Sequence, residues 1–161
     1  MNKQAHWENV YQTKGRDEVS WFSEHLETSL RLITSNSGGK DAAIIDVGGG
    51  NSNLVDDLLD NGYTDISVLD ISAKAINDSQ ERLGKKAEGV KWIVADITNI
   101  DLPENHVDIW HDRAVFHFLT AAEDRRKYID LVKRSVRSGG HVVVASFSLD
   151  GPLKCSGLEV V

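Results

Sequence analysis

Residues 42–52 read AAIIDVGGGNS, and this stretch decides the fold. The apolar run at 42–47 predicts a buried β-strand, and the three glycines predict a tight turn into a helix that begins near Ser52. Free backbone N–H groups at such a helix start can face a ligand carboxylate or phosphate. The same glycines could serve only to let the helix pack closely on the strand, so the loop alone leaves both interpretations open.

Four more short β-rich runs follow this turn, and helical patterns separate most of them. They lie at residues 66–70, 92–95, 107–110 and 142–145. Strands that alternate with helices and are buried on both faces indicate an α/β fold with a doubly wound, mostly parallel sheet. The link at 96–106 contains Pro103 but is long enough to pass two strands, so we predict the strand order 3-2-1-4-5 with helices on both faces.

Two acidic residues mark the ends of neighbouring predicted strands. Asp70 ends the second strand and Asp96 follows the third. The carboxyl ends of parallel strands share one edge of the sheet, where ligands bind, and an acid after the second strand commonly accepts hydrogen bonds from ribose hydroxyls. Either aspartate alone could be a turn former. Together with the glycine loop, they favour a nucleoside-binding site.

The ordered set of motifs resembles the class I S-adenosylmethionine-dependent methyltransferases, over Ile44 to Ala145. The loop at 46–50 is similar to the acidic-x-Gly-x-Gly loop of that family, and Ala95-Asp96-Ile97 is similar to its adenine-side motif. The resemblance implies a Rossmann-like domain that transfers a methyl group from S-adenosylmethionine to a small molecule or a protein side chain and leaves S-adenosylhomocysteine. It implies cofactor contacts at Asp46, Gly48, Gly50, Asn51, Ser52, Asp70, Ile71, Asp96, Ile97 and His111.

Two alternatives remain at this stage. A nicotinamide dinucleotide fingerprint requires a glycine three residues beyond the second one, where this chain has Asn53. Ser52 also departs from the methyltransferase pattern, because many members have a third glycine there. The second alternative is a methyltransferase-like module without activity that acts through a partner. Methyl transfer from labelled cofactor to any acceptor would separate an enzyme from such a module.

Residues 111–119, HDRAVFHFL, follow the fourth predicted strand, where the resembled family places groups that face the cofactor and the substrate. His111 is our candidate for a general base, since an imidazole titrates near neutral pH. The alternative is that His111 and Arg113 only form hydrogen bonds at the pocket rim. His117 lies in an apolar run, and this context predicts a packed and hydrogen-bonded histidine. We predict no metal site from the spacing of His, Asp and Glu.

Aromatic residues gather ahead of the predicted domain. The resemblance to small bacterial methyltransferases implies that Trp7, Tyr11 and Trp21 cover the cofactor and, with Arg113, form part of the substrate pocket. Simple packing of an extra helix on the sheet is the alternative. The spacing of the apolar residues at 21–33 predicts a helix with one buried face.

Composition and charge exclude several classes of partner. The formal net charge of −7 argues against nonspecific binding to nucleic acid or to an anionic membrane. Cys155 is the single cysteine, so no intrachain disulfide can form, and a cytoplasmic location is expected. No apolar run approaches the roughly 20 residues that span a bilayer.

The chain divides by composition into a helical cap segment at 1–41 and the methyltransferase-like domain at 42–161. Members of the resembled family continue past the fifth strand with a helix and an antiparallel strand pair, and this sequence leaves no residues for those strands. We therefore expect a C-terminally incomplete domain. Its fifth strand would be a bare edge rich in β-branched residues, and we expect self-association through that edge.

Overall fold

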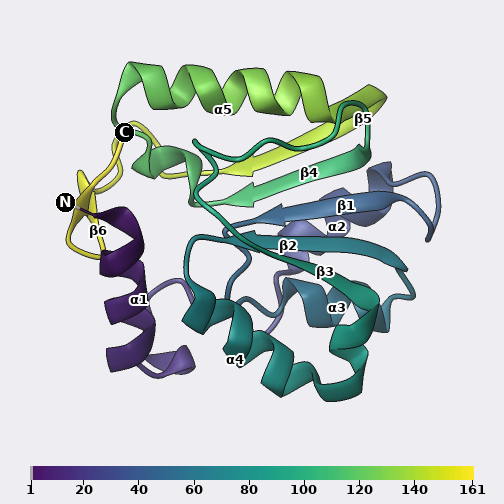
Figure 1. Cartoon of the computed structure of the whole chain (residues 1–161), viewed down its shortest axis with the longest axis horizontal. Coiled ribbons are helices and arrows are strands. Elements are labelled where there is room, and N and C mark those ends of the chain that lie inside the picture. Colours follow the sequence, from purple (N-terminus) through teal and green to yellow (C-terminus); the bar gives the residue numbers. More distant parts are fainter. Residues whose placement is uncertain (1) are drawn as a thin grey trace.

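The computed structural model describes residues 2–161 and contains a five-stranded parallel sheet in the order β3-β2-β1-β4-β5, as predicted (Figure 1). The strands are β1 (Ala43–Val47), β2 (Asp65–Asp70), β3 (Val90–Val94), β4 (Val107–Arg113) and β5 (Val136–Ala145). The link between β3 and β4 contains turns but no helix, which confirms that it crosses the sheet as a loop. The carboxyl ends of β1, β2 and β4 therefore meet at one edge.

Alternate residues of each central strand enter different hydrophobic clusters, one on each face of the sheet. Ile44 packs in one cluster and Ile45 in the other, and the neighbours Ile109 and Trp110 divide in the same way. Because side chains alternate across a strand, these continuous apolar runs bury both faces. This pattern explains why the sheet carries helices on both sides.

The helices are α1 (Lys3–Thr13), α2 (Glu27–Asn36), α3 (Leu54–Asp60), α4 (Ala73–Leu83) and α5 (Ala122–Ser135). Helices α2, α3 and α4 contribute to the cluster on one face, whereas α5 contributes to the cluster on the opposite face. Figure 1 shows α5 beside β5 and apart from α2, α3 and α4. Among residues 2–161, no helix is both long enough and apolar enough to cross a membrane.

The predicted start of the helix at residue 21 and the predicted end of the fourth strand are wrong. Residues 21–26 are not helical, and α2 begins only at Glu27. Strand β4 runs on to Arg113, three residues beyond its predicted end, because polar side chains at 111–113 find buried or partly buried partners elsewhere in the chain. A polar sequence in a strand end is compatible with burial only when such partners exist.

Helix α1 lies across the carboxyl edge of the sheet and is attached to the start of α4 (Figure 1). The Glu8 carboxylate accepts hydrogen bonds from the backbone N–H groups of Ala73, at 2.6 Å, and Lys74, at 3.2 Å. It also accepts one from the Ser72 hydroxyl, which in turn caps α4 by accepting from Ala75 N–H. A carboxylate at a helix N-terminus satisfies free donors and complements the helix dipole. The cap segment is thereby held over the site.

The chain continues past β5 and forms a small antiparallel hairpin of β6 (Lys154–Cys155) and β7 (Leu158–Glu159). These two short strands were not predicted from the sequence. The hairpin forms a separate sheet beside α1 and does not extend the main sheet (Figure 1). Val161 N–H donates to the His117 carbonyl at 2.9 Å, which brings this segment next to the turn after β4.

Strand β5 pairs only with β4 among residues 2–161, and its Val142 and Val144 side chains are 47% and 46% exposed. Unpaired backbone groups and exposed valines make such an edge prone to pair with a second chain. We expect concentration-dependent dimers by sedimentation velocity, and we expect Val144→Lys to abolish them. Ile129→Lys, on the exposed face of α5, is the matched control and should leave the dimers intact. A wild-type monomer at every concentration would contradict this expectation.

Candidate functional site

A cavity of about 350 Å³ opens at the carboxyl edge of the sheet. Five of the predicted cofactor-binding residues line it: Gly48, Asp70, Ile71, Asp96 and Ile97. All four residues predicted for the substrate pocket line it as well: Trp7, Tyr11, Trp21 and Arg113. The structure thus brings the strand ends and the N-terminal aromatic residues to one cavity. The remaining predicted residues lie outside its wall: Asp46, Gly50, Asn51, Ser52 and His111.

The glycine loop passes too close to its neighbours for side chains. Gly48 has φ of +71°, and a Cβ there would lie 2.0 Å from Val115 Cγ2. Gly50 has φ of +25°, and a Cβ there would lie 2.4 Å from Asp70 Oδ2. Both the positive φ values and the close approaches require glycine. The loop backbone consequently faces the cavity at Gly48, while Gly50 leaves room for the Asp70 carboxylate.

Asp70 is buried at the end of β2, and its Oδ1 accepts a hydrogen bond from Ser72 N–H at 2.8 Å. Burial raises the pKa of Asp70 to about 7, and the charges of Asp46 and Glu8 raise it further, against the lowering effect of the Ser72 N–H. A carboxyl group poised near neutrality in a cavity is typical of a ligand-binding position.

Asp96 and Ile97 follow β3 and lie in the same wall. Asp96 Oδ1 accepts hydrogen bonds from Thr98 N–H at 2.9 Å and from the Thr98 hydroxyl at 2.7 Å. The aspartate therefore shapes its own turn. Since each carboxylate oxygen has two lone pairs, the group retains capacity for a further donor from the cavity.

His111 does not line the cavity, and its buried position argues against the predicted roles as a general base and cofactor contact. The side chain is 1% exposed; its Nδ1 lies 2.7 Å from Asp46 Oδ1 and its Nε2 lies 2.9 Å from the Ser29 hydroxyl. Both ring nitrogens of His111 therefore already have hydrogen-bond partners. The reason is the longer β4, which places His111 inside a strand rather than in the loop after it.

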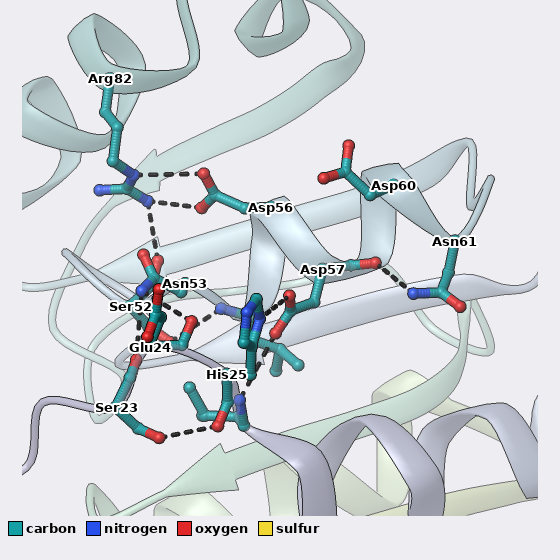
Figure 2. Close-up of polar contacts among 12 residues, drawn as sticks. Ser23, Glu24, His25, Ser52, Asn53, Asp56, Asp57, Asp60, Asn61 and Arg82 are labelled. Atoms are coloured by element: carbon teal, nitrogen blue, oxygen red, sulfur yellow. Dashed lines mark hydrogen bonds and ion pairs between the residues drawn. The ribbon is translucent and has the colours of Figure 1, made fainter.

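Asn51 and Ser52 do not line the large cavity, and Arg82 of α4 binds both of them; Figure 2 shows Arg82 beside Ser52. Arg82 donates to Asn51 Oδ1 at 2.8 Å and to the Ser52 carbonyl at 2.9 Å, and it pairs with Asp56 at 2.7 Å. Helix α3 begins at Leu54, two residues later than predicted, and Ser52 accepts from Leu54 N–H. The contacts of Arg82 therefore stabilise the conformation of the glycine loop.

Asn53 joins the N-terminal segment at 16–26 to the start of α3 (Figure 2). Its side-chain amide donates to the carbonyls of Ser23, at 3.1 Å, and Glu24, at 3.0 Å, and its oxygen accepts from Arg16. A second link lies nearby, where Asp57 Oδ1 and His25 Nδ1 are 2.8 Å apart. The segment that carries Trp21 is therefore fastened to the helix after the glycine loop.

We expect Asn53→Ala to lower the free energy of unfolding by about 1–3 kcal/mol, because the buried amide of Asn53 loses its hydrogen bonds to Arg16, Ser23 and Glu24. The released segment should be cut faster by trypsin at Lys14 and Arg16. The matched control is Asn61→Ala at the exposed end of α3, where the amide bonds only the Asp57 carbonyl. Chemical denaturation and timed proteolysis check both variants, and wild-type cleavage of Asn53→Ala would show that the segment is held by other contacts.

The cavity has an aromatic wall made of Trp7, Tyr11, Trp21 and Phe118. Trp7 packs edge to face on Trp21, with centroids 5.8 Å apart, and on Phe118, with centroids 5.1 Å apart. Arg113 donates to the Trp21 carbonyl at 2.8 Å, which ties this wall to the end of β4. Aromatic faces form a dry surface that also attracts cations. The wall thus suits a ligand that is apolar or carries a positive charge.

Arg113 at the end of β4, and Val115 and His117 in the turn after it, line the cavity. Asp112 holds this turn by accepting from Val115 N–H at 2.8 Å and from the Tyr128 hydroxyl at 2.6 Å. Burial raises the pKa of Asp112 to about 6, and these bonds oppose the rise. Ala114 within the turn has φ of +73°, a strained value for alanine. Such strain at a cavity wall is typical of a functional site.

The sequence did not predict several of the residues that line the cavity. Lys3, Phe118, Phe147 and Cys155 line the cavity, and so does His117, which was predicted to be a satisfied core histidine. That prediction is wrong, because neither ring nitrogen of His117 has a hydrogen-bond partner. Nothing in an apolar run reveals this, since the missing partners are a property of the tertiary arrangement. In residues 2–161 no group of three or more His, Cys, Asp or Glu side chains is arranged to hold a metal.

Comparison with known proteins gives consistent matches. A 119-residue region is 26% identical to the eEF1A lysine and N-terminal methyltransferase of Mus musculus, covering 74% of this chain and 17% of that protein. The human EEF1A lysine methyltransferase 2 is 24% identical over 160 residues, covering 91% of this chain and 68% of that protein. The chain thus spans about a sixth of the first relative and about two thirds of the second.

Solved structures agree on the fold. The phosphoethanolamine N-methyltransferase 1 of Haemonchus contortus, in complex with phosphoethanolamine and S-adenosylhomocysteine, superposes with a TM-score of 0.71 at 16% identity, covering 88% of this chain and 30% of that one. A family model described as "Methyltransferase domain" matches residues 45–144, which contain the glycine loop, Asp70 and Asp96. The chain therefore belongs to the methyltransferase domain family.

Proposed function

We propose that this domain transfers a methyl group from S-adenosylmethionine to an amino nitrogen of a protein. The observation that carries the proposal is the single cavity that joins the predicted cofactor residues of β1, β2 and β3 to the aromatic wall of the N-terminal segment. When bound, the cofactor supplies a methyl group on a cationic sulfur, which a lone pair opposite the sulfur can displace.

The residues present fit this cofactor. Asp70 lines the cavity at the end of β2, where its carboxylate would accept hydrogen bonds from ribose hydroxyls. Asp96 would accept from the adenine amino group, with Ile71 and Ile97 packed on the base. The Gly48 backbone would lie against the methionine part, where any side chain would collide with Val115. Asn53, at the position of a dinucleotide glycine, instead holds the N-terminal segment, which is evidence against a nicotinamide site.

An amino group as the acceptor is supported by the relatives and by the wall. Both relatives described above are named for lysine methylation of eEF1A, and one of them is also named for N-terminal methylation. A lysine side chain combines an apolar stem with a cationic end. The rings of Trp7, Trp21 and Phe118 would pack on the stem and attract the ammonium. The chain's own contribution to the rate is then alignment of the nitrogen behind the methyl group in a site with little water.

The test is methyl transfer from radiolabelled S-adenosylmethionine to purified eEF1A, with phosphoethanolamine as a small-molecule amine in parallel. We expect label in the protein, located on a lysine or on the N-terminal amine by mass spectrometry. Asp70→Ala serves as the control that weakens cofactor binding. Label in phosphoethanolamine alone would overturn the protein acceptor, and label in neither would favour a module without this activity.

A further inference from the structure

His117 is an unsatisfied polar group in the wall of the cavity. Its side chain is fully buried, and neither Nδ1 nor Nε2 has a hydrogen-bond partner. Buried polar groups in proteins are almost always paired, so each exception requires an explanation. A histidine kept in a cavity wall with two unused nitrogens is explained most directly by a ligand that hydrogen-bonds to it.

Two aromatic rings pack on the imidazole of His117 at the cavity wall. Phe147 stacks on it with centroids 4.9 Å apart and an interplanar angle of 17°, and Phe118 packs edge to face at 4.3 Å. Phe118 in turn contacts Trp7 of the aromatic wall. The histidine therefore lies next to the surface along which an alkylammonium chain would bind, and away from bulk water.

The other titratable groups in this wall come from five elements or the loops after them: Lys3 and Tyr11 of α1, Asp70 of β2, Asp96 after β3, Arg113 of β4 and Cys155 of β6. Three of them already have partners, since Lys3 pairs with Asp124, Arg113 bonds the Trp21 carbonyl and Asp96 bonds Thr98. Burial lowers the pKa of His117. The imidazole is consequently neutral at physiological pH and has one nitrogen able to accept a proton.

We propose that His117 is the group that accepts the proton which the acceptor ammonium must lose before methyl transfer. This proposal rests on the proposed function, because it assumes an amine acceptor. The ammonium N–H gives its proton to the free imidazole nitrogen, which leaves a lone pair on the amine and an imidazolium on His117. The lone pair then forms the N–C bond while the C–S bond breaks, its electron pair stays on sulfur, and His117 later releases the proton to water.

The first test compares His117→Phe and His117→Gln with wild type, with eEF1A and labelled S-adenosylmethionine as the probe. At pH 7 we expect turnover to fall by about 100-fold or more in both variants. Above its lowered pKa His117 stays neutral, so the wild-type rate should be flat from pH 7 to 9. In the variants only amine that is already deprotonated can react, so their rate should rise about tenfold per pH unit towards the lysine pKa of about 10.4. Imidazole added to His117→Gly should restore part of the rate.

A second measurement does not depend on activity. A peptide with the sequence of the eEF1A acceptor site, with its amine unmethylated, should shift the ¹⁵N resonances of the His117 ring when S-adenosylhomocysteine is also present. S-adenosylhomocysteine alone should not shift them. His141→Gln, on the exposed edge strand β5, is the matched control and should keep wild-type turnover and pH dependence. Calorimetric affinity for S-adenosylhomocysteine within twofold of wild type would show that the His117 variants are folded.

Failure of this proposal is distinguishable from failure of the proposed function. If wild type does not methylate a protein amine, the proposed function fails. If wild type methylates it and the variants lose rate with an unchanged, flat pH profile, His117 has only a structural role and this inference is overturned. Wild-type turnover in His117→Phe would overturn it as well.

Discussion

Gly50→Ala is expected to weaken binding of S-adenosylhomocysteine by about 100-fold, which is the largest effect on cofactor binding that the geometry predicts. The new Cβ would lie 2.4 Å from Asp70 Oδ2, 3.1 Å from Asp70 Cγ and 3.2 Å from the Ala75 Cβ. The carboxylate must move away, and two charge-assisted hydrogen bonds to the ribose, each of about 1.5–3 kcal/mol, are lost. Every 1.4 kcal/mol corresponds to a tenfold change in affinity, so about 3 kcal/mol gives 100-fold.

Gly62→Ala is the matched control. Gly62 also has a positive φ, of +84°, but a Cβ there meets nothing within 4 Å. Both substitutions carry the strain of alanine in the left-handed region, about 1–2 kcal/mol, and only Gly50→Ala displaces Asp70. Isothermal titration calorimetry with thermal unfolding separates the two effects. Equal affinities in the two variants would show that the Gly50 approach to Asp70 does not control the site.

Asp70→Asn is expected to weaken cofactor binding at least about tenfold at pH 8 and to remove a pH dependence that the wild type should show. Burial first, and then the charges of Asp46 and Glu8, raise the pKa of Asp70 to about 7. The ribose hydroxyls bond best to the ionised form. The fraction ionised rises about tenfold between pH 6 and pH 8, so wild-type affinity should rise by about the same factor.

The stability of the free protein should change with pH in the opposite direction to the cofactor affinity. A carboxyl group whose folded pKa lies above its unfolded value stabilises the free protein below about pH 4, and this contribution is lost as the pH rises through about 7. Ionised Asp70 thus destabilises the free domain and binds the ribose, so cofactor should recover more stability at pH 8 than at pH 6. Calorimetry with S-adenosylhomocysteine at pH 6, 7 and 8 is the check. A wild-type affinity that is flat with pH, or an Asp70→Asn affinity equal to wild type, would argue against this role.

The sheet and most of the site could be predicted because their signals are local. Apolar runs such as residues 42–47 bury both faces, and the glycines and Asp70 follow strands directly, so sequence position alone places them at one edge. The misplacement of His111 had a different cause. Its burial depends on Asp46, 65 residues away, and on Ser29, 82 residues away, and such partners are invisible to a local pattern.

The N-terminal segment shows the same limit. Trp7, Tyr11 and Trp21 could be assigned to the pocket by resemblance, but the contacts that hold them could not. Glu8 reaches the start of α4, and Asn53 reaches the carbonyls of Ser23 and Glu24, so both tethers join parts of the chain far apart in sequence. The sequence could not predict either that both ring nitrogens of His117 lack a hydrogen-bond partner, because this depends on the tertiary structure.

Thermal unfolding with ligands tests most directly whether this cavity binds S-adenosylmethionine. At 100 times the dissociation constant, a ligand that binds only the folded state stabilises it by about 2.7 kcal/mol, so S-adenosylmethionine and S-adenosylhomocysteine should both raise the melting temperature in a concentration-dependent manner. NAD and NADP at the same concentrations should not, and Gly50→Ala should lose the response. A shift with NAD and none with either sulfur compound would contradict the account.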